Sequence, residues 1–555
     1  MARTGLRAVG DLDRAWLAKI FDAAAPVQVG AFTYRPFRKD TGFFVEETGA
    51  NGHSWVQPIT HALGSGDAGM AFYSRIGDRF YQIPLDWFPS AAKWGIDPGF
   101  TATNLRFFFA LDATCIACHT DPPRRSLTAD EVFADPMPAG VGCERCHGPG
   151  AKHVASSKRE DIVNPKRLTA QQQIELCAQC HQDTASLYLP GKEPFGYRPG
   201  DPLDAFRRNE LREPAAPDRV ILLEHPDRMT RSACFLKSAG QMTCTTCHDP
   251  HTSSRGQPAA HWRERCNTCH GTQHPCTETK VARAKNGDDC VACHMRRRAT
   301  DDIPSVEIVD HWIQTRPPPT ATAKAAPPDR IVAWSQHLTG KAPTDEAEAA
   351  LAVAFDRYGR ADEADQHAHR AIQSGSHVPE VYEQAAARLG MHGRFDDAGK
   401  LLAKALAFAP NRRRTLMAYA MTALDAGSPA ARAEAEHALD RMIALDPNDQ
   451  RALEVKGMLL VRAGRYAEGK QLLARAAAAG PSGGAAHVGL AALALRDHDR
   501  EAALHELEAA RQIAPDDGWI AAQLATLAGS AAPAGSPTQP SAVSAWLPAD
   551  LRNPR

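Results

Sequence analysis

The pattern of hydrophobic and polar positions divides the 555-residue chain into three parts. Between residues 25 and 112, apolar and polar side chains alternate in short runs such as GAFTYRPF and MAFYSRIGDRFYQIPL, which are separated by Gly, Asn and Pro. Alternation with a period of two indicates β-strands that have one buried face, and the interruptions indicate turns. We therefore predict a small β-rich region over residues 1–112.

From residue 345 onward the apolar positions follow a helical period, and the pattern repeats. A turn glycine recurs at positions 359, 393, 427 and 464, and His498 occupies the next equivalent place, in steps of 34, 34, 37 and 34 residues. A proline closes the units at positions 410, 447, 481 and 515. A helix–turn–helix unit of about 34 residues with these features resembles the tetratricopeptide repeat (TPR). The resemblance implies an all-α solenoid over residues 345–525, and the polar tail at 526–555 is predicted to be disordered.

Between these parts the apolar periodicity is weak. Residues 113–314 read as short helices and loops, and the proline-rich run TRPPPTATAKAAPP at 315–328 indicates a linker over 315–344. The predicted fold class is therefore multidomain: a β-rich N-terminal region, a segment of loops and short helices, and a C-terminal all-α solenoid.

Composition narrows the choice of partners. Charged residues make up 23% of the chain and the net charge is −1, which favours neither a nucleic acid nor a membrane surface as the partner. No run approaches the ~18 consecutive apolar residues of a spanning helix, so we expect no integral membrane segment.

The cysteines identify the chemistry of the middle segment. All 14 lie between Cys115 and Cys293, and twelve of them form six Cys-x-x-Cys-His motifs. Numbered in chain order, motifs 1 to 6 are Cys115/Cys118/His119, Cys143/Cys146/His147, Cys177/Cys180/His181, Cys244/Cys247/His248, Cys266/Cys269/His270 and Cys290/Cys293/His294.

This spacing is typical of covalent haem c attachment. Two thiols with two residues between them reach the two vinyl groups of one porphyrin, and the next histidine becomes the proximal ligand of the iron. Zinc knuckles, a disulfide framework and thioredoxin-like redox pairs are weaker explanations, because none of them requires a histidine after every pair. We therefore expect six covalently attached haem c groups and their iron.

The middle segment resembles a known family. The runs CHGPGAKH (146–153), CTTCHDPH (244–251), CVACHMRR (290–297) and DHWI (310–313) are similar to the multihaem cytochromes related to the tetrahaem cytochrome of nitrifying bacteria. Many of those proteins carry a C-terminal TPR array, which strengthens the resemblance. It covers residues ~40–312 and identifies 113–314 as a hexahaem cytochrome c domain.

The resemblance also implies distal ligands, because most haems of that family are bound by two histidines. His153 and His251 match the family's distal positions, and each is too close to its own motif to reach round that haem, so it should bind a neighbouring iron. His311 and His61 are the next best matches. His225 and His274 are proposed from their location alone. The histidines from His337 onward read as solvated residues of the repeats.

Two cysteines remain outside the motifs. Cys234 and Cys276 are predicted to be buried thiols or a disulfide, and a thiol close to a haem is the alternative.

Haem c attachment in bacteria takes place beyond the cytoplasmic membrane, so we expect a periplasmic or extracytoplasmic location. The first residues, MARTGLRAVGDLDRAWLAKIF, lack the apolar core of a secretory signal. The expectation drawn from this is an incomplete or misassigned start.

Electron transfer is the leading functional hypothesis, with no catalytic residues assigned. Irons bound by two histidines have no open position, so they can only change oxidation state. The TPR array is expected to dock a redox protein partner through its groove. The alternative is an oxidoreductase acting on a small nitrogen or sulfur compound at a five-coordinate haem, although no Cys-x-x-Cys-Lys motif of that kind occurs. A third hypothesis, a scaffold stapled by haems, is the weakest.

Overall fold

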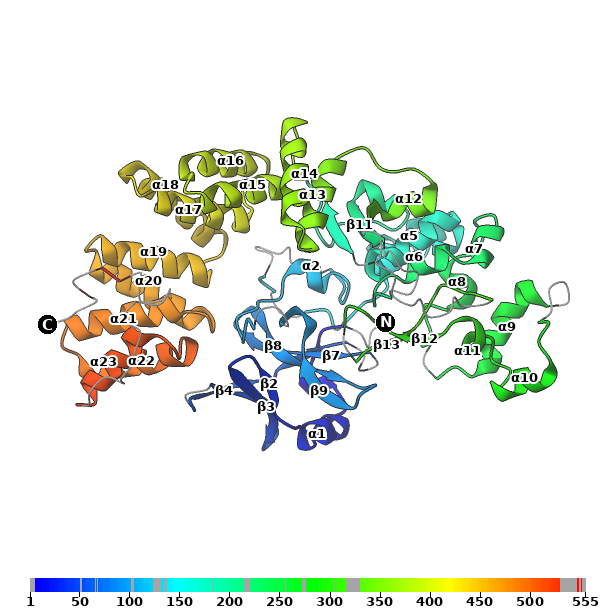
Figure 1. The fold of residues 1–555 in the computed structure, drawn as a ribbon, viewed down its shortest axis with the longest axis horizontal. Coiled ribbons are helices and arrows are strands. Elements are labelled where there is room, and N and C mark those ends of the chain that lie inside the picture. Colours follow the sequence, from blue (N-terminus) through cyan, green and yellow to red (C-terminus); the bar gives the residue numbers. More distant parts are fainter. Residues whose placement is uncertain are drawn as a thin grey trace.

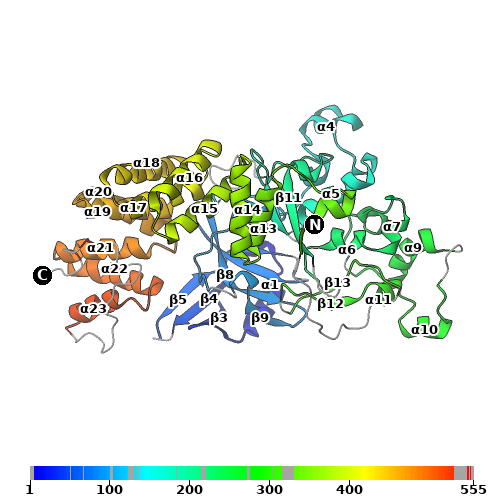
Figure 2. The ribbon, with the colours of Figure 1, turned by 45° about the horizontal axis from the view of Figure 1, so that its top comes forward.

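The computed structural model describes most of the chain: residues 5–49, 52–64, 66, 68–100, 104–122, 131–133, 137–182, 184–213, 220–254, 256–271, 276–303, 305–315, 330–529, 547–548 and 551. Three parts are visible in Figures 1 and 2. The β domain (5–111) lies inside an arc of paired helices, the array (347–527), and the motif segment (113–314) lies on the side away from the end of the array.

Two antiparallel sheets build the β domain. The four-stranded sheet has the order β2-β3-β4-β5 and the five-stranded sheet the order β1-β6-β7-β8-β9. Their strands are β1 (Arg7–Ala8), β2 (Val27–Val29), β3 (Phe32–Lys39), β4 (Gly42–Gly49), β5 (Ser54–Pro58), β6 (His61–Leu63), β7 (Met70–Ile76), β8 (Arg79–Phe88) and β9 (Lys93–Ile96).

The core of the β domain combines residues of both sheets with helix α1 (Arg14–Asp22). The rings of Phe21, Phe43, Phe72 and Trp94 form its centre, with neighbouring centroids 4.8–5.8 Å apart. Tilted and edge-on packing of this kind contributes beyond the area that is buried. The predicted β-rich region therefore has a continuous core of its own.

The five-stranded sheet also contacts the motif segment. Ile116, one of the two residues between Cys115 and Cys118, is fully buried in a second cluster with Tyr73 and Phe80 of the sheet. Motif 1 is therefore anchored to the β domain by a side chain inside the motif itself.

The motif segment is a set of short helices around small sheets. The helices are α2 (Ala113–Ile116), α3 (Glu144–His147), α4 (Ala151–Ser156), α5 (Ala170–His181), α6 (His225–Thr230), α7 (Ala233–Lys237), α8 (Cys244–Cys247), α9 (Ala259–His270), α10 (Lys280–Lys285) and α11 (Cys290–His294). The strands are β10 (Ala185–Tyr188) and β11 (Arg207–Glu213), which pair with each other, and β12 (Arg297–Ala299) and β13 (Glu307–Val309), which form a two-stranded sheet.

Part of the predicted linker belongs to the motif segment's core. Strand β14 (Arg330–Ala333) pairs antiparallel with β11, and helix α12 (Trp334–Thr339) follows it. Val332 and Trp334 are buried in one cluster with Ile174 and Met229. The expected linker of 315–344 is therefore too long at its C-terminal end, because strand pairing with a distant segment overrides the local composition. Residues 316–329 lie outside the described residues.

The array consists of helix pairs, as the repeats predict. The first helices of the pairs are α13 (Ala347–Arg357), α15 (Pro379–Met391), α17 (Arg413–Ala426), α19 (Gln450–Arg462) and α21 (Gly484–Arg496). The second helices are α14 (Ala361–Gln373), α16 (Phe395–Phe408), α18 (Pro429–Leu445), α20 (Tyr466–Ala479) and α22 (Arg500–Ile513), and α23 (Gly518–Leu527) follows the last pair.

The turn inside each pair shows why glycine recurs there. The glycines at 359, 393, 427 and 464 have φ angles of 71–75°, which is the left-handed region that favours glycine. His498 adopts φ 57° at the equivalent place. Close packing also uses glycine, because a Cβ added to Gly457 would lie 2.8 Å from the Leu473 side chain.

The described residues of the C-terminal tail depart from the prediction of disorder, because α23 extends into it as far as Leu527 and two further leucines are buried. Leu547 and Leu551 are buried in the hydrophobic cluster of the last repeats, with α19, α21 and α22. Tertiary packing explains the difference, since two leucines in a polar tail carry no local signal.

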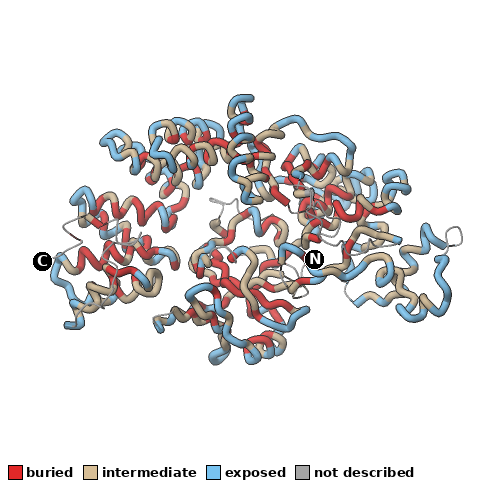
Figure 3. Tube along the Cα trace, in the orientation of Figure 1, coloured by how far each residue is buried: buried red, intermediate tan, exposed pale blue. Residues whose placement is uncertain are grey.

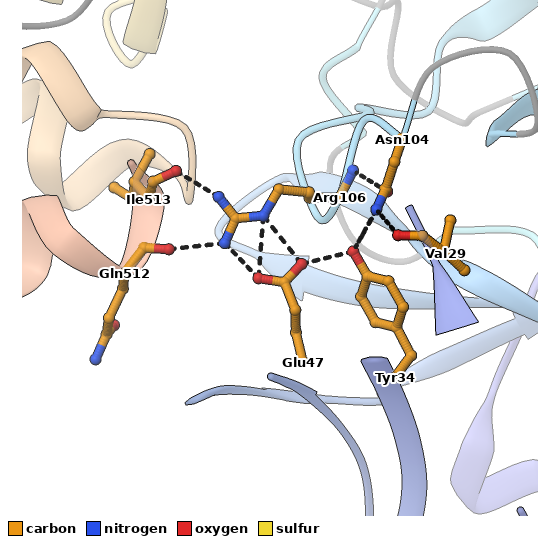
Figure 4. Close-up of polar contacts among 7 residues, drawn as sticks. All are labelled: Val29, Tyr34, Glu47, Asn104, Arg106, Gln512 and Ile513. Atoms are coloured by element: carbon orange, nitrogen blue, oxygen red, sulfur yellow. Dashed lines mark hydrogen bonds and ion pairs between the residues drawn. The ribbon is translucent and has the colours of Figure 1, made fainter. Parts of the chain in front are cut away.

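A loop between two helix pairs and the end of helix α22 connect the array to the β domain. Arg79 forms a buried ion pair with Asp446 and donates a hydrogen bond to the Asn448 carbonyl at 3.2 Å. Arg106 is bound to the buried Glu47 and donates to the carbonyls of Gln512 and Ile513 at the end of α22 (Figure 4). We call this contact the array–β interface.

None of the helices among the described residues is long and apolar enough to cross a lipid bilayer.

The left-handed His498 allows a test of the turn. Replacing it with glycine should stabilise the array by about 0.5–1 kcal/mol, because glycine adopts φ 57° without the steric cost that a Cβ carries. Thermal unfolding followed by circular dichroism at the helix band measures the change. Gly464→Ala is the matched control and should lower stability by about 1 kcal/mol. A loss of stability in the His498→Gly variant would contradict this account.

The array–β interface should depend on its buried ion pair as a unit. Arg79→Ala leaves Asp446 charged and buried, so we expect a loss of about 3–5 kcal/mol in chemical denaturation. The double variant Arg79→Met/Asp446→Leu removes both charges and should retain most of the stability. If the single and double variants lost the same stability, the buried charge would not be the cause.

Candidate haem-binding site

The six motifs share one local geometry. Each lies in or directly beside a short helix, or at the end of a longer one, namely α2, α3, α5, α8, α9 and α11 in chain order. In motif 1, α2 ends at Ile116 and the following turn carries Cys118 and His119. Residues three apart face the same side of a helix, so the two cysteines of a motif point to one side. None of the 14 cysteines forms a disulfide. Every motif therefore presents two free thiols and an adjacent imidazole.

Helix α5 shows how the sequence positions a motif. Its N-terminus is closed by a capping box between Thr169 and Gln172, which satisfies backbone donors of the first turn. Ile174 and Leu176 are buried in the core of the motif segment, and motif 3 occupies the last turn. Burial of one face of α5 thus fixes where its thiols and His181 lie.

Contacts between thiols connect the motifs in space. The Cys118 thiol of motif 1 lies within hydrogen-bonding reach of Cys180 of motif 3, and Cys177 of motif 3 lies within reach of Cys244 of motif 4. Motif 2 lies beside motif 3. Burial is the largest cause that raises the pKa of its Cys146, and the motif 3 thiols Cys177 and Cys180 add to the rise.

The last two motifs continue this connection. Cys266 of motif 5 lies within hydrogen-bonding reach of Cys290 of motif 6. Burial raises the pKa of the motif 4 thiol Cys247, and the nearby thiols Cys234 and Cys269 add to the rise. The spatial order is therefore 1–3–4–5–6, with motif 2 beside motif 3.

A large cavity lies between the β domain, the motif segment and the array. Its volume is about 3240 Å³, and cysteines and histidines of motifs 1 to 4 line it. Sites for one small ligand occupy roughly 300–1000 Å³, so this cavity has room for several large groups.

Histidines meet in pairs in and around the cavity. The ring centroids of His147 and His251 are 6.0 Å apart, with planes within 21° of parallel. Those of His248 and His311 are 6.1 Å apart and within 28°.

A third pair lies beside these two. The His181 and His225 centroids are 5.8 Å apart, and the His225 ring is also 4.4 Å from that of His311. Motif histidines 147, 181 and 248 thus each face a second histidine from elsewhere in the chain.

Buried polar contacts hold the segments of His225 and His311 in place. Arg228 of α6 forms a buried ion pair with Asp310, which ties the helix that begins at His225 to the loop that carries His311. The hydroxyl of Ser232, which follows α6, donates to the His311 carbonyl at 3.2 Å and accepts from the Ile313 amide.

Asp227 connects α6 to two further elements. Its amide donates to the Gln182 side chain directly after motif 3, and its carboxylate accepts from His337 Nδ1 at 2.7 Å. The expectation that His337 is a solvated residue of the repeats is wrong, because α12 packs on α6. Sequence reasoning also missed Asp227, Arg228 and Asp310, although charged neighbours of candidate ligands are a usable signal.

Several imidazoles have one nitrogen fixed by the backbone. The Nδ1 atoms of His147, His153, His294 and His311 lie 2.7–3.0 Å from carbonyl oxygens. Metal-binding histidines commonly donate one ring N–H to a carbonyl, which orients the other nitrogen towards the metal. The arrangement fits an iron ligand at Nε2.

Burial keeps the clustered imidazoles neutral. Desolvation lowers the pKa values of His181, His225 and His248, and it lowers that of His311 to about 4. A neutral imidazole offers the lone pair that a metal requires.

Two buried cations on the cavity wall fit the acidic groups of haem. The side chains of Arg145 and Arg207 donate to backbone carbonyls, and among the described residues neither forms an ion pair with a carboxylate. A buried charge without a counter-charge is costly, and haem propionates would supply one. Thiols, imidazoles and cations together therefore fit haem c.

The remaining predicted ligands have different surroundings. His153 lies on the cavity wall, His119 also lines the cavity, and His270 is exposed at the end of α9. His61 packs edge-on against Phe80 at 4.7 Å, next to the cluster that anchors motif 1. His274 lies outside the described residues.

The two cysteines outside the motifs are not bonded to each other. Cys276 is an exposed free thiol, so the prediction of a buried thiol or a disulfide fails there. Cys234 is half-buried near Cys247 and Cys269, between motifs 4 and 5.

The β domain contributes one buried acid to the cavity. Asp86 on β8 lines the cavity, and its side chain lies against that of Asp97. Burial raises the pKa of Asp86 well above its usual value, and the Asp97 carboxyl adds to the rise.

Comparison with known proteins gives two sequence matches. The model of the family described as cytochrome c554 and c-prime matches residues 104–148, which contain motifs 1 and 2. The multihaem cytochrome MtrA of Shewanella baltica (strain OS185) is 23% identical over 201 residues, which are 33% of this chain and 53% of that protein. The chain thus spans about half the length of this curated relative.

Several solved structures are similar to about a third of the chain. The thermophilic TPR protein TTC0263 of Thermus thermophilus is 18% identical, covering 33% of this chain and 99% of that one, with a TM-score of 0.27. The pilus biogenesis factor PilW is 20% identical, and the match covers 33% of this chain and 86% of PilW, with a TM-score of 0.29. The MamA protein is 20% identical, and the match covers 27% of this chain and 81% of MamA, with a TM-score of 0.25.

The raised pKa of Asp86 predicts a stability that depends on pH. In the unfolded chain the group ionises near pH 3.9, whereas in the folded protein it stays protonated to higher pH. Stability therefore falls as pH rises through this window. Asp86→Asn removes this titration. The thermal midpoint of the variant minus that of the parent protein should therefore increase as pH is raised from 4 to 8. A constant difference across that range would contradict the raised pKa.

Proposed function

We propose that this chain, a multihaem cytochrome with a C-terminal array of tetratricopeptide repeats, is an electron-transfer relay in which each of six motifs holds one haem c. The observation that carries the proposal is the pairing of imidazoles around motifs 2, 3 and 4, with ring centroids 5.8–6.1 Å apart.

These separations match coordination of one metal ion by two imidazoles. A metal–imidazole bond is about 2 Å long, so two imidazoles on opposite sides of one ion have ring centres roughly 6 Å apart. We assign His251 as the distal ligand at motif 2, His225 at motif 3 and His311 at motif 4. His61, His153 and His274 remain proposed ligands for the other motifs, together with the proximal histidines 119, 270 and 294.

Ligation by two histidines favours electron transfer over catalysis. The haem iron supplies a one-electron couple, and no coordination position is left open for a substrate. The chain's own residues set the spacing of the groups, keep the imidazoles neutral and place cations beside the cavity.

The contacts between motifs define the proposed route. Motif 3 lies at the centre, in contact with motifs 1, 2 and 4, and motifs 5 and 6 extend the series beyond motif 4. Every step along this route joins motifs whose thiols are neighbours, so electrons would pass between adjacent haems.

We also propose that the array docks a protein partner, since stacked helix pairs form extended binding surfaces. One inter-repeat loop and the end of α22 already contact the β domain through Arg79 and Arg106, so the partner would use other faces of the array. An extracytoplasmic location follows from the place where haem c is attached in bacteria.

The assigned distal ligands can be tested one at a time. In the haem-loaded protein, His251→Ala, His225→Ala and His311→Ala should each convert one haem from low to high spin, because each opens one coordination position. Electron paramagnetic resonance and the visible high-spin band measure the change. His505→Ala, on the exposed surface of the array, is the control and should change neither signal.

A spectrum that stays fully low-spin in all three variants would show that these histidines are not ligands. A substantial high-spin fraction in the parent protein would instead favour the oxidoreductase alternative.

A further inference from the structure

We propose that the arm, residues 256–298 with helices α9, α10 and α11, is the surface through which the relay exchanges electrons with an acidic redox protein. The inference rests on the proposed relay, and it adds which end meets the partner and what charge that partner carries.

The arm is the part of the molecule that extends farthest from the array. Figure 1 shows α9, α10 and α11 at the side opposite α23, beyond α8. No residue in these three helices is buried, and Figure 3 draws them in the colours of exposed and intermediate positions. A partner can therefore reach this end without displacing the β domain or the array.

The arm carries the last two motifs of the series. Cys266 of motif 5 and Cys290 of motif 6 are within hydrogen-bonding reach of each other, and Cys269 lies near Cys247 of motif 4. An electron that arrives from motif 4 has its terminal sites here. By contrast, motif 1 is anchored to the β domain through Ile116, inside the arc of the array.

The charge of the arm differs from that of the whole chain. The chain has a net charge of −1, whereas residues 256–298 contain eight Lys or Arg and four Asp or Glu, a net charge of +4. The positive residues are Arg263, Arg265, Lys280, Arg283, Lys285, Arg296, Arg297 and Arg298.

Part of this positive charge is available to a partner. Asp288 is shared by Arg263 and Arg283, at 3.4 and 3.6 Å. Lys280 and Lys285, at the two ends of α10, are exposed, and neither forms an ion pair with a carboxylate among the described residues. They extend a positive field beyond the arm's surface.

Exposed apolar side chains lie among these cations. Val281, between the two lysines on α10, is 71% exposed, and Leu236 on α7 is 68% exposed. Helix α7 adjoins the arm, since its Cys234 lies near Cys269. Apolar contacts inside a charged rim are typical of transient protein interfaces.

The charge indicates an acidic partner. Complementary charge steers encounter and raises association rates 10- to 1000-fold at low ionic strength, while like charge suppresses wrong partners. Because motifs 5 and 6 are redox sites, the partner must itself carry a redox centre, which favours a redox protein over a lipid surface.

The test uses full-length, haem-loaded protein and an acidic flavodoxin as the probe. Stopped-flow absorbance follows the reduction of the haems by the flavodoxin hydroquinone while ionic strength is raised from about 20 mM to about 500 mM. The parent protein should react fastest at low ionic strength, and its rate should fall steeply as salt screens the charges.

The variant Lys280→Glu/Lys285→Glu lowers the charge of the arm by four, which brings the sum over its amino-acid side chains from +4 to zero. It should slow the reaction at low salt about tenfold or more and abolish the salt dependence. The matched control, Lys404→Glu/Lys470→Glu, makes the same change on exposed positions of the array and should stay within about twofold of the parent rate. Haem content and helix content are measured for both variants.

Three outcomes would overturn the proposal. The control could slow the reaction while the arm variant does not, which would place docking on the array. A basic cytochrome c could outpace flavodoxin at low salt, which would reverse the partner's charge. Anionic phospholipid vesicles could bind the parent but not the arm variant, with flavodoxin rates unchanged, which would make the arm a membrane contact. Failure of the relay itself is distinguishable, because haems of the parent protein would then not be reduced by a neutral small mediator either.

Discussion

The motif segment is organised by one geometric requirement. Two thiols one helical turn apart and the next imidazole can face one bound group only if the motif lies at a short helix or at the end of a longer one, with the other side held by the protein. This explains why the segment consists of short helices and why its apolar periodicity is weak. The segment therefore depends on its surroundings, namely the β domain behind Ile116, the three-stranded sheet and α12.

The contacts that hold the parts together are mostly buried charges. Arg79 with Asp446 joins the array to the β domain, and Arg228 with Asp310 joins the two segments that carry His225 and His311. Arg106 pairs with Glu47 inside the β domain and from there donates to carbonyls at the end of α22. A buried ion pair adds little net stability compared with apolar packing, but losing one partner is costly. Such pairs therefore set position more than stability, and the histidine rings that they position lie 5.8–6.1 Å apart.

Neutral imidazoles and two arginines without a carboxylate partner among the described residues line the cavity. Burial removes positive charge from the histidines, while Arg145 and Arg207 keep theirs without a carboxylate among the residues that the structure describes. Neutral nitrogen atoms and positive charge are thus supplied by different residues of the cavity. Positive charge returns at the exposed arm, where the lysines on α10 are accessible to another protein.

The sequence by itself determined the cofactor chemistry and the three-part organisation. The motifs depend on spacing within five residues, and the β-strands depend on alternation with a period of two. The repeats depend on a helical period that recurs about every 34 residues, so all three patterns can be identified along the chain. The turn glycines illustrate this, since their left-handed φ angles follow from a local steric rule.

What brings distant segments together could only be decided by the tertiary structure. The pairing of His147 with His251, the order 1–3–4–5–6, the strand β14 within the expected linker and the two buried leucines of the tail all depend on contacts between residues far apart in sequence. His337 next to Asp227 is of the same kind. Such contacts are selected by the packing of whole elements, and no local pattern of residues records them.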